Sequence, residues 1–196
     1  LSESGKNPEA FFHMSKIHPE ITDKLSTFIE QQKIFFVATA AQQGRVNISP
    51  KGMDSLRVLN EKRVIWLNLT GSGNETSAHL QQANRITIMF CSFSGTPMIL
   101  RLYGMAREVT REDSEWERLH SLFKPLPGCR QIFDIEVDLV QTSCGTGVPL
   151  FEYIDDRDQL NSWAIKKGEQ GIRKYWEDKN QVSLDGFATN IMKKNS

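Results

Sequence analysis

Short apolar runs separated by polar turns recur through the first two thirds of the chain. Residues 34–40 form an apolar run that ends at a Gln-Gln-Gly turn, and residues 46–49 resume with alternating polarity. Residues 56–59 and 63–69 repeat this arrangement around a short Asn-Glu-Lys turn. Runs of this length, bounded by turn residues, are typical of strands, so each pair predicts an antiparallel hairpin.

Three later runs extend the same pattern. Residues 85–90 and 98–109 predict two further strands, and residues 131–140 alternate between polar and apolar side chains. About six strands joined by short connections predict a mainly β fold, an antiparallel barrel, because closing a sheet on itself removes its exposed edges.

Helical periodicity is found on both sides of these strands. Apolar residues at helical spacing predict a helix over residues 19–29 that covers one end of the barrel, and another over residues 111–123. From residue 155 the pattern turns helical again, with Gly168 as a stop and a further helix over residues 172–176. We expect these last helices to cover the mouth of a site or a subunit contact.

A glycine-containing loop, residues 70–76, joins the strand at 63–69 to a helix-forming segment. Ser72 and Glu75 have the spacing of a capping box, in which each side chain binds a backbone N–H at the helix start. A helix that begins here would present unpaired N–H groups and a positive dipole end to a phosphate. For a lone glycine loop an ordinary capped helix is the more common structure, and this loop matches neither a P-loop nor a dinucleotide-binding fingerprint.

Several motifs, in their order along residues 34–140, resemble the FMN-binding split barrels related to pyridoxamine 5'-phosphate oxidase. They are FVATA at 36–40, GRVNISPKG at 44–52, IWLNLTGSGNET at 65–76 and RLYGMA at 101–106. Two later motifs, SCGTGVP at 143–149 and NQVSLDG at 180–186, resemble the tail of one uncharacterised branch of that family. The resemblance implies a six-stranded antiparallel split β-barrel with peripheral helices.

The resemblance also implies a cofactor, FMN, and the residues that bind it. Ser49 and Lys51 would hold the phosphate and ribityl chain, and the strand before the glycine loop would lie along the isoalloxazine edge. The oxidase has an arginine where Ser49 aligns. Phosphate binding in this chain would therefore depend more on N–H and hydroxyl donors than it does in the oxidase. The predicted cofactor-binding residues are Ser49, Lys51, Leu67, Asn68, Thr70, Ser72, Gly73, Asn74 and Thr76.

Two functions follow from this resemblance. The first is an FMN-dependent oxidoreductase, a homodimer with flavin at the subunit interface that takes a small-molecule substrate or a nicotinamide donor. The Arg-Leu-x-Pro ending by which the oxidase grips pyridoxal phosphate is absent from the sequence. The second is a carrier or sensor that binds flavin or haem without turnover, because no residue is compelled to act as acid or base. No catalytic residue is assigned.

The composition of the chain limits the classes of partner that it is expected to bind. The 196 residues include 24 basic and 24 acidic ones for a formal net charge of zero, which gives no electrostatic footprint for nucleic acid or an anionic membrane. The longest apolar run is far shorter than the roughly 20 residues of a membrane helix. Three unpatterned cysteines indicate free thiols and a cytoplasmic location. Cys144 fits a tight loop better than a nucleophile, and His and Cys lack metal-ligand spacing, so no metal site is predicted.

These observations predict one main domain with two appendages. Residues 1–14 are an N-terminal extension or leader. Residues 15–150 form the FMN-binding split barrel with its N-terminal helix. Residues 151–196 form a C-terminal helical extension packed on the barrel.

Overall fold

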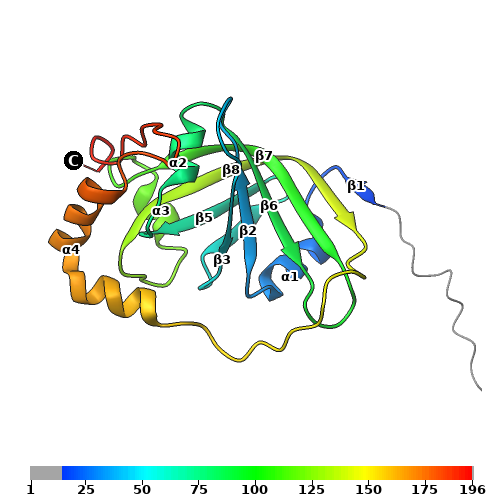
Figure 1. Ribbon diagram of the computed structural model, residues 1–196. Coiled ribbons are helices and arrows are strands. Elements are labelled where there is room, and N and C mark those ends of the chain that lie inside the picture. Colours follow the sequence, from blue (N-terminus) through cyan, green and yellow to red (C-terminus); the bar gives the residue numbers. More distant parts are fainter. Residues whose placement is uncertain (1–14, 196) are drawn as a thin grey trace, which may run out of the picture.

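The computed structural model describes residues 15–195, so the predicted extension at residues 1–14 lies outside the described part. One antiparallel sheet forms its centre (Figure 1). The predicted mainly β fold is confirmed, although the described residues form eight strands and not six. The strands are β1 (Lys16–His18), β2 (Phe35–Thr39), β3 (Asn47–Lys51), β4 (Leu56–Asn60), β5 (Arg63–Leu69), β6 (Arg85–Cys91), β7 (Ile99–Val109) and β8 (Cys129–Ser143).

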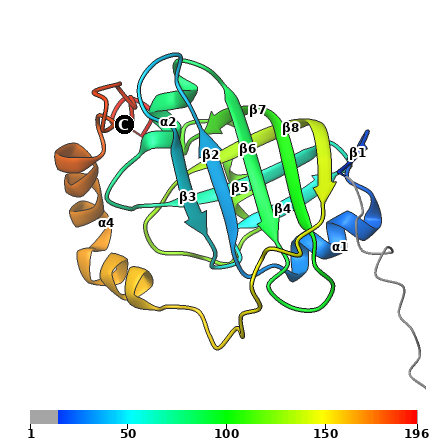
Figure 2. The same cartoon turned by 45° about the vertical axis from the view of Figure 1, so that its right-hand side comes forward.

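The order of the strands leaves the barrel open along one side. Neighbouring strands follow the order β3-β2-β6-β7-β8-β5-β4, and β1 pairs with β8. β3 and β4 are consecutive in the chain, yet they form the two opposite edges of the sheet. Figure 2 shows β2, β3 and β6 on one side of the molecule, with β4 and β5 behind them. The barrel is therefore split between its two edge strands.

Apolar side chains from alternating positions fill the interior of the barrel. In β2 every second residue, Phe35, Val37 and Thr39, is buried, because successive side chains of a strand point to opposite faces. On β5, Trp66 stacks against Phe133 of β8 with ring centroids 4.8 Å apart. Both rings belong to the main apolar core, so β5, which lies next to the edge strand β4, is packed against the centre of the barrel.

The predicted N-terminal helix closes one end of the barrel. α1 (Asp23–Gln31) begins after Thr22, whose hydroxyl accepts a hydrogen bond from the Leu25 N–H, so it starts later than predicted. Leu25 and Ile29 lie one turn apart and are buried in the barrel core.

A second apolar cluster lies on the outer face of β5, where α3 (Trp116–His120) packs. α3 is much shorter than the predicted helix. Asp113 binds both the N–H and the hydroxyl of Thr110, and this holds the preceding segment in a turn. Leu119 of α3 joins Leu67 of β5 in this cluster, so β5 is covered by apolar side chains on both faces.

The remaining helices lie beside the split. α2 (Glu75–Leu80) follows β5, and α4 (Gln159–Lys179) forms most of the C-terminal extension. Gly168 interrupts α4 with a φ of 64°, a left-handed conformation open to glycine, so the predicted stop is a kink between two helical halves. A strap at residues 149–158 leads from the barrel to α4 (Figure 1). Residues 180–195, the C-terminal tail, return to α2.

Candidate functional site

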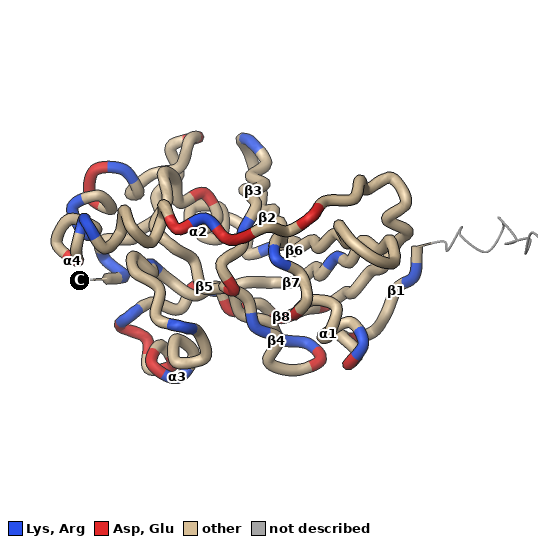
Figure 3. The backbone as a smooth tube through the Cα atoms, turned by 90° about the horizontal axis from the view of Figure 1, so that it is seen from below, with Lys and Arg blue, Asp and Glu red and all other residues tan. Residues whose placement is uncertain are grey.

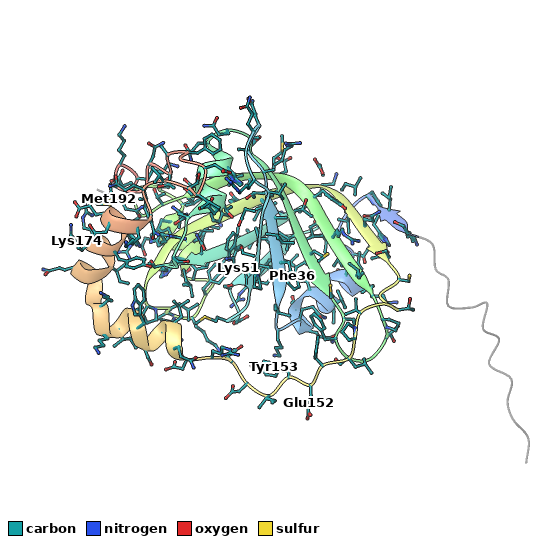
Figure 4. All side chains as sticks on the ribbon, viewed as in Figure 1. Phe36, Lys51, Glu152, Tyr153, Lys174 and Met192 are labelled. Carbon is teal, nitrogen blue, oxygen red and sulfur yellow. The ribbon has the colours of Figure 1, made fainter. Side chains whose placement is uncertain are left out.

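A cavity of about 260 Å³ opens at the split of the barrel. Asn47, Ser49 and Lys51 of β3 face it, because a strand presents every second side chain to the same side. From the other wall β5 contributes Trp66 and Asn68, and the loop between β5 and α2 completes the lining. Figure 4 shows Lys51, the last residue of the edge strand β3, near the middle of the molecule.

The structure brings most of the predicted cofactor-binding residues together. Leu67 stays outside the cavity lining, because its side chain is fully buried beneath α3 and its N–H donates to the Ser55 carbonyl at 2.8 Å. Thr70 also stays outside, because its hydroxyl donates to the Gly128 carbonyl at 2.7 Å and accepts from Trp176. The other seven predicted residues line the cavity: Ser49, Lys51, Asn68, Ser72, Gly73, Asn74 and Thr76.

The predicted capping box is wrong. α2 begins at Glu75 with Asn74 as its N-cap residue, and no side chain makes a capping hydrogen bond. The Glu75 carboxylate instead accepts from the N–H of Leu184 in the C-terminal tail at 3.0 Å. Among the described residues, no hydrogen bond involves the Ser72 hydroxyl.

The glycine loop uses its backbone carbonyls in hydrogen bonds, and among the described residues it leaves some of its N–H groups unused. The carbonyls of Gly71 and Gly73 accept from Asn180 Nδ2 and Arg130 Nη1, each at 3.1 Å. Within residues 15–195, the N–H groups at positions 72–74 donate to no other group. Unpaired N–H groups beside a cavity are suited to bind an anion.

Arg130 is a cavity residue that was not predicted from the sequence. Its neighbours in β8 pair regularly, Gln131 with Asn68 and Cys129 with Leu69, and this leaves Arg130 as the extra residue of a β-bulge. The side chain lines the cavity and is 2% exposed. The predicted strand began at residue 131, although an arginine at the start of an apolar strand was a signal in the sequence.

The Arg130 guanidinium is incompletely bonded. Nη1 donates to the Asn180 side-chain oxygen at 2.8 Å as well as to Gly73, while Nε is buried without a partner. Burial lowers the pKa of Arg130 to about 9. A buried guanidinium with a free donor is suited to a carboxylate or phosphate ligand.

Lys51 is the second cation of the cavity. Burial, followed by the positive charge of Arg130, lowers its pKa to about 8. Its Nζ lies 5.2 Å from the ring centroid of Trp66, close enough for a cation–π contact. Neither Lys51 nor Arg130 pairs with a carboxylate in the part of the chain that the structure describes.

The positive charge is a local property of the cavity. Basic and acidic residues are intermixed along the backbone (Figure 3), in keeping with a net charge of zero. Among the described residues that line the cavity, Glu75 is the one carboxylate, and it is engaged by Leu184. The cavity therefore favours an anionic ligand, whereas the whole surface has no such preference.

Neutral polar groups complete the cavity walls. The Asn74 side-chain oxygen accepts from Gln131 at 2.9 Å, which leaves its buried Nδ2 without a partner. Asn47 donates to the hydroxyls of Thr76 at 3.3 Å and Thr39 at 3.2 Å, so its orientation is fixed. Asn47 was also missed, although its position two residues before Ser49 puts it on the same face of the predicted strand.

Comparison with known proteins identifies the family. The sequence profile described as "Pyridoxamine 5'-phosphate oxidase" matches residues 21–144. The chain belongs to the pyridoxamine 5'-phosphate oxidase family. The pyridoxamine 5'-phosphate oxidase family protein ustO of Aspergillus flavus is 34% identical over 194 residues, which span 89% of this chain and 77% of that protein.

Solved structures share the fold of this family member. HupZ of Group A Streptococcus is 23% identical with a TM-score of 0.50, and the match covers 61% of this chain and 91% of HupZ. A protein of Lactobacillus delbrueckii described as a pyridoxamine 5'-phosphate oxidase homologue is 15% identical with the same TM-score, covering 63% and 94% of the two chains. At these identities the likeness establishes the split-barrel fold alone.

Other candidate features lie away from the cavity. Cys91 and Cys129 are buried, Cys144 is exposed, and none of the three lines it. The described range holds no group of three or more His, Cys, Asp or Glu side chains that could bind a metal ion. None of the helices between residues 15 and 195 has the length and apolar character to cross a membrane.

The lowered pKa of Lys51 makes stability depend on pH. With a pKa of about 8 in the folded protein against 10.5 normally, the unfolded chain binds more protons between these values, so stability rises with pH across this window. From pH 8 to 10 the unfolding free energy of the ligand-free protein should rise by about 2 kcal/mol relative to Lys51→Met. Urea denaturation measures this difference. Lys62→Met, at an exposed site, is the control and should follow the parent protein. Identical pH profiles for parent and Lys51→Met would contradict the lowered pKa of Lys51.

Proposed function

We propose that this protein is an FMN-binding flavoprotein that acts as an oxidoreductase on a small organic substrate. The observation that supports it most is the pair of cations, half-buried Lys51 and buried Arg130, in one cavity without a carboxylate that forms an ion pair with either. FMN, when bound, supplies the hydride-transfer chemistry, and the chain contributes binding and orientation. Electrons would come from the substrate or from a nicotinamide.

The phosphate of FMN would bind at the inner end of the cavity. Lys51 and Arg130 supply two positive charges, and the backbone N–H groups at positions 72–74 supply neutral donors. Hydrogen bonds between ionised groups are about twice as strong as neutral ones, so the two cations would contribute most of the phosphate affinity. The hydroxyl of Ser49 lies on the same face of β3 as Lys51 and would contact the ribityl chain or the phosphate.

A second copy of the chain would complete the site. The cavity of about 260 Å³ is smaller than the roughly 300 to 1,000 Å³ of typical small-molecule sites, so one chain accounts for only part of an FMN molecule. The opposite face of β3 exposes Ile48, and Val46 just before the strand is also exposed, at 62% and 72%. An exposed apolar edge strand is prone to aggregate unless another surface packs against it, and a second copy of the chain in a symmetric homodimer would provide that surface.

Flavin is favoured over haem by the cavity lining. Haem iron is held in proteins by His, Cys, Met or Tyr side chains. None of these residue types lines the described cavity, whereas it is rich in hydrogen-bond donors and positive charge.

The three unpaired thiols fit a reducing compartment, and we therefore place the protein in the cytoplasm.

Charge reversal at Lys51 tests the phosphate site. Lys51→Glu should raise the dissociation constant for FMN about 30-fold, equivalent to about 2 kcal/mol, because a carboxylate would then face the phosphate. Fluorescence titration of the flavin-free protein measures this, with Lys62→Glu as a control of equal charge change at an exposed site. An unchanged constant for Lys51→Glu would show that Lys51 does not bind the phosphate.

The proposed homodimer predicts a mass of two chains for the flavin-loaded protein in solution. Light scattering coupled to size exclusion measures this mass, and the absorbance near the visible flavin bands locates the cofactor in the same run. A monomeric peak that retains stoichiometric flavin would contradict the shared site.

Turnover separates an oxidoreductase from a flavin carrier. Anaerobic mixing of the FMN-loaded protein with NADH or NADPH should bleach the flavin absorbance, and air should restore it over repeated cycles. A protein that holds flavin tightly but is reduced no faster than free FMN by either nucleotide, or by a panel of small organic reductants, would be a carrier.

A further inference from the structure

The C-terminal tail and the end of α4 contact the rear of the cavity wall. Asn180 directly follows α4 and is fully buried. Its Nδ2 donates to the Gly71 carbonyl at 3.1 Å, and its Oδ1 accepts from Arg130 Nη1 at 2.8 Å. One helical turn earlier, Trp176 Nε1 donates to Thr70 Oγ1 at 2.8 Å. The glycine loop and the buried arginine are therefore both held from outside the barrel.

These contacts fix the direction in which the loop backbone faces. The carbonyls of Gly71 and Ser72 accept from Asn180 Nδ2 at 3.1 and 3.5 Å. In a trans peptide the carbonyl and the following N–H point in opposite directions, so the N–H groups of Ser72 and Gly73 point away from Asn180. Both residues line the cavity. Asn180 thus keeps two backbone donors available to a ligand.

Asn180 also orients the guanidinium. Arg130 has two hydrogen-bond acceptors, the Asn180 side chain and the Gly73 carbonyl, and its Nε is a buried donor without a partner. A guanidinium binds a phosphate well only when its planar fork is held in the right direction. Loss of Asn180 would remove one of the two contacts that hold it.

We propose that Asn180 and Trp176 are positioning residues that make the cavity selective for ligands that carry a phosphate. They act through Arg130 and the loop N–H groups, and neither of them lines the cavity. The inference rests on the proposed FMN site. It gives a role to a segment beyond residues 21–144, the range that the family profile matches.

The test compares two flavins that differ in the phosphate alone. Dissociation constants for FMN and riboflavin are measured by fluorescence on the flavin-free full chain, for the parent and for Asn180→Ala. The variant should bind FMN about tenfold more weakly and riboflavin with nearly unchanged affinity. Gln181→Ala is the control, because this neighbouring side chain is exposed and bonds only within α4 and its end. It should match the parent for both flavins.

Trp176→Phe keeps an aromatic ring in the core and removes the Nε1 donor to Thr70. This variant replaces Asn180→Ala in the test if Asn180→Ala does not fold. It should also weaken FMN more than riboflavin. Equal losses for both flavins, or no loss for either in a folded variant, would overturn the inference while leaving the proposed function intact. Failure of the parent itself to bind either flavin would overturn the proposed function, and the inference with it.

Discussion

Two cations in the split of the barrel, half-buried Lys51 and buried Arg130, are the constraint on which the candidate site depends. Removing a charged group from water is costly unless a partner of opposite charge or a full set of hydrogen bonds compensates it. Burial lowers the pKa of both side chains, and no described carboxylate forms an ion pair with either, although the charge of Glu108 partly offsets the burial of Arg130. An anionic ligand would supply the missing compensation. Several features of the fold can be understood as the means of holding the two charges in place.

The two cations are held by different means. Lys51 is held by regular structure, because it lies on an edge strand and its ammonium faces Trp66, which itself stacks on Phe133 in the core. Arg130 is held by irregular structure, a β-bulge in β8 and a buried asparagine after α4. The first arrangement belongs to the barrel. The second includes a contact from the C-terminal tail, so the tail helps to position a cavity residue as well as covering the barrel.

The structural features that depend on local sequence patterns could be predicted from the sequence. Alternation located the hairpins, and with the family resemblance it located Ser49, Lys51 and most of the glycine loop at one cavity. Contacts distant in sequence were not predictable in this way. The capping box was wrong because Glu75 binds Leu184, which lies 109 residues away. Arg130 was missed because a bulge directs its side chain, and no period in the sequence marks a bulge.

The central claim, that two cations compensate a bound phosphate, is tested most directly by phosphorus NMR of FMN bound to the protein as pH is lowered. A phosphate monoester in water takes up a proton near a pKa of about 6. Between Lys51 and Arg130 the dianion would be favoured, so the bound phosphorus resonance should stay at its dianionic position to well below that pH. A bound phosphate that titrates as free FMN does would contradict the account, because it would place the phosphate in water and away from both cations.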